Sequence, residues 1–317
     1  MLLLRASRQS LQLTPLAAPL IRGGLISQHG NIRHARRHAR PFSSDPSGRP
    51  TRTAIVTGAA RGIGRAIAVR LAQDGYSITA NDLPALQDEL DTLTAELQSA
   101  YGVRAYTHVA DVSSPEQVGE LVRASVDTLG PLNTMVANAG IAQVKPLLEL
   151  TPDDWKRMFE VNVAGVHYCF QAAARAMIAQ AEGKAEGDRL AGKLISAASI
   201  VAFRPFAQLG HYSASKWAVR GLSQVYAMEL AKHKITVNAY APGIVDTKMW
   251  ELIDSGLGKK EGKAKGEVIR QYSDQLIALG RTSVSEDVAG LVSFLASKDA
   301  DYITGQTYIV DGGIIYT

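Results

Sequence analysis

Three side chains could carry out acid–base chemistry on a carbonyl or an alcohol. Tyr212 and Lys216 are four residues apart in a segment that predicts a helix, so the phenol and the ammonium lie on one helix face. A free tyrosine, with a pKa of about 10, is a poor acid or base at neutral pH, and a nearby cation lowers that value. Ser199 stands thirteen residues before Tyr212, at the end of an expected strand, where its hydroxyl could hold a carbonyl oxygen. Together they predict a site that moves a proton to or from a substrate oxygen.

A glycine-rich segment, residues 57–64, joins an expected strand over 53–57 to an expected helix over 63–74. Its glycines let the backbone turn sharply and approach a pyrophosphate, and the free N–H groups at the helix start meet the negative charge. The segment therefore predicts a dinucleotide site. The residues expected to line it are Gly58, Arg61, Gly62, Ile63 and Gly64.

Asp82 ends the next expected strand, 18 residues after Gly64, at the spacing of an adenosine-ribose acceptor. Its carboxylate can accept hydrogen bonds from both ribose hydroxyls of NAD and would repel the 2′-phosphate of NADP. The adjacent Asn81 and Leu83 carry no positive charge. The sequence therefore favours NAD(H) as the cofactor and leaves NADP(H) possible, unless Asp82 serves only to form the turn before Pro84.

Positioning these groups requires strands and helices in alternation, and the sequence shows them from Thr53 to its end. Short apolar runs predict strands, and segments with apolar residues at helical spacing predict helices. Further strands are expected over 77–81, 103–109, 132–137, 193–198, 235–240 and 306–310, and further helices over 86–97, 115–129, 152–180, 212–232 and 285–296. Because parallel strands need helical crossovers, this alternation predicts an α/β fold whose parallel sheet is covered by helices on both faces.

Residues 246–284 do not fit this alternation. An excursion of such length between a strand and a helix is usually a lid or a pocket wall. Its first part is rich in glycine and lysine, so we expect residues 246–270 to be poorly ordered without ligand and to close over bound cofactor.

The first 44 residues differ in charge from the rest of the chain. They contain seven arginines and no Lys, Asp or Glu, whereas the remaining residues carry 27 basic and 30 acidic side chains, a net charge of −3. An arginine-rich, acid-free segment is typical of a mitochondrial transit peptide, and Arg40-Pro41-Phe42-Ser43-Ser44 resembles a matrix-processing site. We expect residues 1–44 to be a transit peptide, 45–52 a linker and 53–317 a catalytic domain in the mitochondrial matrix. The alternative is a cytoplasmic protein with a disordered extension.

Composition argues against several other functions. The mildly acidic body of the chain disfavours nucleic-acid binding. No run of eighteen apolar residues is present, so we expect no membrane span. Cys169 is the single cysteine, which rules out an internal disulfide and a cysteine-based metal cluster, and we expect no metal.

The chain resembles the short-chain dehydrogenase/reductase family over residues 53–317. The motifs that carry this resemblance are Thr-Gly-x-x-x-Gly-x-Gly at 57–64, Asp111-Val112, Asn138-Ala139-Gly140, Asn162, Ser199, Tyr212 with Lys216, and Pro242-Gly243. The resemblance implies one Rossmann-type, doubly wound domain with a seven-stranded parallel sheet, commonly assembled as a homotetramer. It also implies hydride transfer between NAD(P) and a secondary alcohol or ketone.

The resemblance also implies a role for each matching position. Tyr212 would be the general acid/base, and Lys216 would tune it and bind the nicotinamide ribose. Ser199 would position the substrate oxygen, and Asn162 would hold a water in a proton relay. The other cofactor contacts would be Asp82 and Leu83 at the ribose, Asp111 and Val112 at the adenine, Asn138, Ala139 and Gly140 at the adenosine side, and Pro242, Gly243, Val245 and Thr247 at the nicotinamide carboxamide.

A finer resemblance points to the branch of acetoin/diacetyl reductases and 2,3-butanediol dehydrogenases, through residues 81–83, 242–250, 301–306 and 311–313. Ile200, Phe206 and Trp250 would then wall a small apolar pocket beside the catalytic serine. Two alternatives stay open. One is a 3-oxoacyl-carrier-protein reductase that docks through Lys259, Lys260, Lys263 and Lys265, and the other is a non-enzymatic family member.

Overall fold

The computed structural model describes residues 52–182 and 192–317. The expected transit peptide and the linker up to residue 51 lie outside the described residues. Arg52, which we placed in the linker, is the first residue of the first strand.

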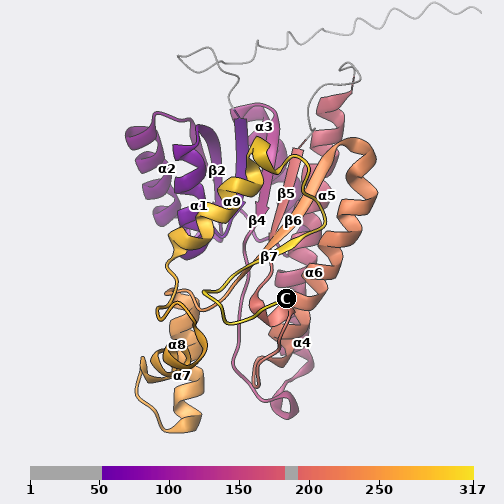
Figure 1. Cartoon of the computed structure of the whole chain (residues 1–317). Helices are drawn as coiled ribbons and strands as arrows, with labels where there is room; N and C mark the ends of the chain where they lie inside the picture. The colour runs from indigo at the N-terminus through magenta and orange to yellow at the C-terminus, as the bar shows by residue number, and fades with distance from the viewer. Residues whose placement is uncertain (1–51, 183–191) are drawn as a thin grey trace, which may run out of the picture. The chain divides into compact units, whose positions relative to one another are not determined.

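Seven parallel strands form one sheet in the order β3-β2-β1-β4-β5-β6-β7 (Figure 1). The strands are β1 Arg52–Thr57, β2 Tyr76–Asp82, β3 Ala105–Val109, β4 Leu132–Ala137, β5 Gly192–Ala197, β6 Ile235–Pro242 and β7 Thr307–Val310. Every residue of β5 and β6 is buried, as expected of central strands covered on both faces. The predicted doubly wound, seven-stranded parallel sheet is therefore confirmed.

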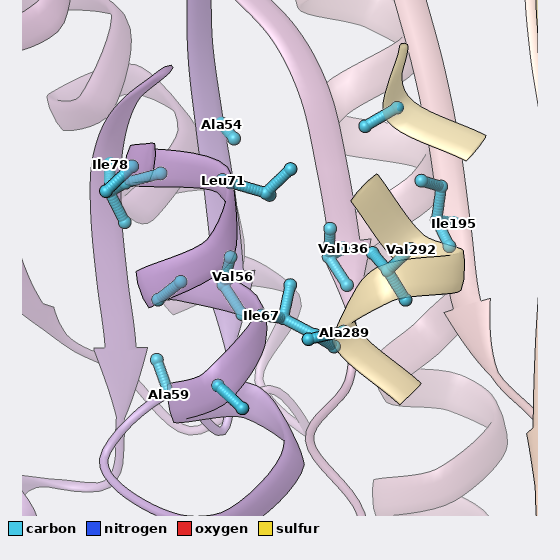
Figure 2. Close-up of a cluster of buried hydrophobic side chains, with 14 of the residues drawn as sticks. Ala54, Val56, Ala59, Ile67, Leu71, Ile78, Val136, Ile195, Ala289 and Val292 are labelled. Atoms are coloured by element: carbon cyan, nitrogen blue, oxygen red, sulfur yellow. The ribbon is translucent and has the colours of Figure 1, made fainter. Parts of the chain in front are cut away.

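Helices cover both faces of this sheet. One apolar cluster draws on α1 (Gly62–Gln73), α2 (Gln87–Tyr101) and α9 (Ser285–Ala296), and the other on α3 (Pro115–Leu129), α5 (Gly165–Ala181) and α6 (Gly210–Leu230). In Figure 2, Ile67 of α1 and Ala289 of α9 lie close to Val136 of β4. Full burial of a side chain such as Ile67 contributes about 1.5–3 kcal/mol, so these clusters hold the layers together. Short 3₁₀ turns occupy Pro84–Leu86, Leu147–Glu149, Ile200–Ala202, Ala231–His233 and Lys298–Ala300.

The position of β1 between β2 and β4 decides where a ligand can bind. From β1 the chain continues into α1 on one face of the sheet, whereas from β4 it continues to α5 on the other face. The two connections diverge at the carboxyl ends of the strands. Doubly wound sheets bind their ligands in the crevice that such a divergence opens.

The helix predicted over 152–180 is present and contains one π-helical turn. Thr151 and Asp154 form a capping box at the start of α4 (Pro152–Phe159), a π-helical turn spans Glu160–Ala164, and α5 continues after it. A π-turn inserts an extra residue into a helix and occurs frequently at functional sites. This one carries Asn162, which is fully buried. The predicted long helix is confirmed, and only the π-turn within it was not predicted, because the apolar spacing on either side of the turn is that of an ordinary helix.

Regular structure also extends through the segment that we expected to be poorly ordered. The segment contains α7 (Lys248–Glu261) and the beginning of α8 (Glu267–Leu276). Ile253 and Leu257 of α7 pack with Val268 of α8 in an apolar cluster of their own. The two helices thus form a hairpin rather than a loose loop.

Asp254 explains why this hairpin forms despite its glycines. Its buried carboxylate accepts hydrogen bonds from the backbone N–H groups of Gly266, at 2.6 Å, and Ile269, at 2.9 Å. A carboxylate at this place caps the amino terminus of α8. The expectation of poor order rested on composition and overlooked this capping contact, which joins residues 12 and 15 positions apart.

The described residues show neither a membrane span nor a metal site. No described helix has both the length and the apolar character needed to cross a bilayer. No group of three or more His, Cys, Asp or Glu among residues 52–182 and 192–317 is placed to hold a metal ion. Cys169 is buried, and burial raises the pKa of its thiol to about 12, so it fills space as a protonated thiol.

Candidate active site

Tyr212, Ser199 and Lys216 come together at the carboxyl end of β5. Ser199 follows β5, and its hydroxyl lies close enough to the phenol of Tyr212, in the first turn of α6, to influence the pKa of that phenol. Lys216 lies one helical turn further along, where Nζ donates to the carbonyl oxygen of Ala197 at 2.8 Å and lies 5.7 Å from the centroid of the Tyr212 ring. All three side chains are buried. The structure thus places a phenol, a hydroxyl and an ammonium in one water-poor corner.

Burial shifts the pKa values of Tyr212 and Lys216 and so determines their protonation states. It raises the pKa of Tyr212 to about 12, and the hydrogen bond with Ser199 opposes that rise only in part. It also lowers the pKa of Lys216 to about 8. We expected Lys216 to lower the pKa of Tyr212, but in the protein alone burial has the largest effect on the phenol, and the Lys216 ammonium is hydrogen-bonded to the carbonyl oxygen of Ala197. Tyr212 therefore carries its proton at neutral pH, as a donor to a ketone oxygen must.

Asn162 lies in the π-turn, and both the oxygen and the nitrogen of its side-chain amide form hydrogen bonds. Oδ1 accepts from the N–H of Ile141 at 2.8 Å, and Nδ2 donates to the carbonyl of Ile141 at 2.9 Å and to Oγ of Ser215 at 3.1 Å. A Cβ on Gly140 would lie 3.1 Å from Oδ1 of Asn162 and 3.5 Å from Nζ of Lys216. The side chain of Asn162 therefore ties the chain after β4 to α6, and its expected role in holding a water stays a prediction.

The glycine-rich loop between β1 and α1 fits a pyrophosphate. Gly58 has φ of +66°, a conformation that favours glycine, and a Cβ on Gly64 would lie 2.0 Å from the carbonyl oxygen of Gly58. No side chain of the described residues caps α1 at Arg61, so the N–H groups at its amino terminus are free for a ligand. Gly62 and Ile63 begin that helix and line the same cleft.

Asn138 couples this loop to the end of β4. Its Nδ2 donates to the carbonyl oxygens of Thr57, at 2.9 Å, and Gly58, at 3.2 Å. Its Oδ1 accepts from the buried hydroxyl of Tyr240 at 2.7 Å, which fixes the orientation of the amide. We did not predict a role for Tyr240, because an aromatic residue in a buried strand is indistinguishable in sequence from ordinary core.

Asp82 lies at the end of β2 with both carboxylate oxygens held by the backbone. Oδ2 accepts from the N–H of Ala60 at 3.2 Å, and Oδ1 accepts from the N–H of Leu83 at 2.9 Å. Each oxygen keeps a further lone pair, so the carboxylate can still accept from ribose hydroxyls. Arg61 lines the same cleft, as expected for the glycine-rich loop, and brings a positive charge that neither Asn81 nor Leu83 carries. The fold therefore places both charges at this part of the site.

The other expected cofactor residues also line this cleft. Asp111 is positioned by an Asx turn, in which Oδ1 accepts from the N–H of Ser113 at 2.9 Å. On the opposite side, a Cβ on Gly62 would lie 3.5 Å from Cγ2 of Thr247, so the loop after β6 faces the glycine-rich loop. The residues placed along the cleft in this way are Leu83, Val112, Ala139, Gly140, Pro242, Gly243 and Val245.

A single cleft of about 790 Å³ connects these groups. Its volume lies within the range of about 300–1,000 Å³ that is typical of cofactor and small-molecule sites. Ile200, Phe206 and Trp250 line the cleft and belong to the apolar cluster around Tyr212. Ile141 and Ala142 also line it, although no sequence signal drew attention to them. The donor groups, the glycine loop and the carboxylate of Asp82 together fit a nicotinamide dinucleotide beside a small carbonyl compound.

Comparisons with known proteins agree with this geometry. A family model described as short chain dehydrogenase matches residues 52–257. The L-2,3-butanediol dehydrogenase of Corynebacterium glutamicum is 48% identical over 266 residues, which cover 84% of this chain and 99% of that protein. A diacetyl reductase [(S)-acetoin forming] of Staphylococcus epidermidis is 42% identical over 270 residues, with 84% and 99% covered.

Solved structures show the same similarity. An acetoin dehydrogenase from Salmonella typhimurium aligns with a TM-score of 0.70 and 33% identity, covering 83% of this chain and 96% of that one. The L-sorbose reductase of Gluconobacter frateurii, complexed with NADPH and L-sorbose, aligns with a TM-score of 0.75 and 28% identity, covering 84% and 97%.

Proposed function

This chain belongs to the short-chain dehydrogenase family, and we propose that its substrate is a small α-hydroxyketone or diketone of the acetoin/diacetyl type. It is an NAD(P)-dependent oxidoreductase that interconverts a secondary alcohol and a ketone. The observation that carries the substrate proposal is the apolar wall of Ile200, Phe206 and Trp250 around the catalytic tyrosine. The names of the butanediol dehydrogenase and diacetyl reductase relatives support the same choice.

A nicotinamide dinucleotide held by the glycine-rich loop and Asp82 would supply the hydride chemistry at the carbonyl or alcohol carbon. The chain itself holds the substrate oxygen and moves a proton. In reduction the hydroxyl of Ser199 donates a hydrogen bond to the ketone oxygen, and Tyr212 gives its proton to that oxygen as the alcohol forms. Lys216, cationic below its pKa of about 8, stabilises the phenolate that is left. In oxidation the phenolate of Tyr212 takes the proton back.

A direct assay separates this proposal from a 3-oxoacyl reductase. We expect NADH oxidation with diacetyl to be much faster than with an acetoacetyl thioester, and the opposite ranking would contradict the proposal. Two of the four lysines that would form the docking face of a thioester reductase have partners within the chain. Nζ of Lys265 lies 3.2 Å from Oε2 of Glu251, and Lys263 hydrogen-bonds to Gln271, so both lysines are engaged within the α7–α8 hairpin.

We predict that Trp250→Ala raises KM for four-carbon ketones about tenfold, because it removes apolar contact at the half-buried wall of the cleft. Bulkier ketones should be less affected or improved, since the pocket widens. Initial rates over a series of ketones measure both effects. Trp155→Ala is the matched control, because Trp155 stacks on Phe159 and does not line the cleft. Unchanged kinetics for every ketone in Trp250→Ala would show that Trp250 only packs.

We further propose that the protein acts in the mitochondrial matrix after removal of residues 1–44. The support is the arginine-rich, acid-free composition of this segment. We expect the mature native protein to begin near Ser43 or Ser44, and N-terminal sequencing of protein isolated from mitochondria measures this. An intact Met1 on protein from the cytosol would overturn the proposal.

A homotetramer is the assembly that we propose from the family resemblance. Trp217, Val225 and Met228 support it, because they are exposed apolar side chains of α6, and such side chains on one element favour burial against another subunit.

A further inference from the structure

A chain of hydrogen bonds joins the helix that carries Tyr212 to the beginning of α4. His211, immediately before Tyr212, is fully buried, and its Nε2 lies 2.8 Å from Oε1 of Gln143. Gln143 donates through its own Nε2 to Oδ1 of Asp154 at 2.8 Å. Asp154, the residue of the α4 capping box, also accepts from Nζ of Lys145 at 2.6 Å. None of these four polar side chains belongs to the catalytic group described above.

The direction of each hydrogen bond in this chain is determined. The Lys145 ammonium and the Thr151 N–H hold the pKa of Asp154 well below its usual range, so the carboxylate only accepts. Gln143 must therefore turn its NH₂ group to Asp154 and its oxygen to His211. His211 must then donate from Nε2.

The state of the second ring nitrogen follows from the same contacts. Burial lowers the pKa of His211, Asp154 opposes this, and Lys145 adds to it, so the ring is neutral at physiological pH. With the proton on Nε2, Nδ1 is a bare acceptor. It is buried and has no hydrogen-bond partner among the described residues. The histidine is thus held in one tautomer by a single partner, Gln143.

The segment that this chain holds, residues 141–145, forms part of the cleft. Ile141 and Ala142 line the cleft, and Val144 packs against α7, where a Cβ on Gly256 would lie 2.8 Å from Cβ of Val144. The segment therefore contacts both the catalytic corner and the helical hairpin that closes the cleft.

A second tie connects the same segment to the opposite wall. The backbone N–H of Lys145 donates to the carbonyl oxygen of Gln208 at 2.8 Å. Gln208 lines the cleft and has φ of 62°. This conformation is unfavourable for a residue other than glycine and persists only where the surrounding structure holds it. Two walls of the substrate end of the cleft are thus held against each other.

We propose that His211 is a positioning residue for the ketone, which, through Gln143, locks residues 141–145 in place as a wall of the substrate end of the cleft. This inference depends on the proposed function in one respect, namely that the substrate is a small ketone. His211 contacts neither the reacting oxygen nor the glycine-rich loop and Asp82. Loss of its hydrogen bond therefore loosens the ketone site and leaves the cofactor site intact.

The test compares variants that keep or remove the donor. His211→Phe keeps a ring and removes the hydrogen bond, and we expect KM for diacetyl to rise about 10- to 100-fold with KM for NADH unchanged. His211→Gln places an amide N–H where Nε2 was and should restore most of the lost affinity. Ser213→Ala is the matched control, because Ser213 follows Tyr212 in the sequence, is buried as His211 is, and its hydroxyl has no partner in the described part of the chain. It should behave as the wild type.

Two further measurements separate positioning from a general loss of structure. Gln143→Leu should reproduce the KM of His211→Phe, and the double variant should be no worse than either, because both changes break the same chain. The ¹⁵N shifts of the His211 ring, assigned by their absence in His211→Gln, should report a neutral ring protonated on Nε2. This readout does not depend on the substrate.

The outcomes distinguish this inference from the proposed function. If the wild type does not turn over diacetyl, the proposed substrate is wrong, and the variants are compared on a ketone that the wild type reduces. The inference is overturned if His211→Phe keeps the wild-type KM for the ketone, if both KM values and kcat change together in proportion to a lower melting temperature, or if the ring carries its proton on Nδ1.

Discussion

Replacing Tyr212 with phenylalanine will lower kcat by about 10²- to 10⁴-fold, the range that general acid–base catalysis contributes. The phenyl ring keeps its place in the apolar cluster with Ile200 and Leu209, so the fold and the cleft should persist. What disappears is the proton that the buried phenol, with a pKa raised to about 12, carries at neutral pH. Steady-state rates with diacetyl measure the loss, and NADH fluorescence titration should show cofactor binding close to that of the wild type.

Tyr226 offers a matched control for this substitution. It lies on the same helix, and its hydroxyl is 2.8 Å from Nδ1 of His167, away from the cleft. Tyr226→Phe removes the same atom from α6 and should leave kcat unchanged. If Tyr212→Phe turned over at the wild-type rate, Tyr212 would not be the proton donor, and the buried Ser199 would be the next group to test.

Local patterns predicted most of the fold. The seven strands lie within a few residues of their expected bounds, because buried parallel strands are short apolar runs punctuated by glycine and by helix caps. The cap of α3 by Ser114, whose Oγ accepts from the N–H of Gln117, has the local geometry that its sequence indicates. Such features depend on residues close together in the chain.

The features that sequence patterns missed depend on long-range contacts. The π-turn at Asn162 is accompanied by hydrogen bonds to Ile141 and Ser215, which are 21 and 53 residues away. Tyr240 hydrogen-bonds to Asn138, which is 102 residues away in the sequence, and His211 hydrogen-bonds to Gln143, which is 68 residues away. In sequence each is an ordinary core or helix residue. These polar atoms come within hydrogen-bond distance of their partners only when the sheet and its helices have assembled.

The protonation of the catalytic pair could not be derived from spacing either. Tyr212 and Lys216 fall on one helix face, as their separation indicates, and this suggests a lowered pKa for the phenol. Burial has the opposite effect on the phenol, because taking the charge of a phenolate out of water raises the pKa of Tyr212. The spacing of the two residues carries no information on how deeply each is buried.

The choice between NADH and NADPH gives the second large effect. We expect the wild type to prefer NADH, and Asp82→Ser combined with Leu83→Arg to shift the preference toward NADPH. Removing the carboxylate abolishes hydrogen bonds to a charged group worth about 1.5–3 kcal/mol, which corresponds to about 10- to 150-fold in affinity for NADH. The same change removes the repulsion of a 2′-phosphate, and the new arginine adds a cation to that of Arg61 in the same cleft. The ratio of kcat/KM for the two cofactors measures the shift.

The single variants separate the two contributions. Asp82→Ser alone should weaken NADH binding with little gain for NADPH, whereas Leu83→Arg alone should help NADPH only modestly, because the carboxylate still repels the phosphate. The side chain of Asp82 also accepts from the N–H groups of Ala60 and Leu83, and a serine hydroxyl cannot replace both contacts. A melting temperature for each variant therefore has to accompany the kinetics, so that a loosened glycine loop is not mistaken for altered selectivity. A wild type that already prefers NADPH would show that Arg61, and not Asp82, dominates this part of the cleft, and the ribose argument would be wrong.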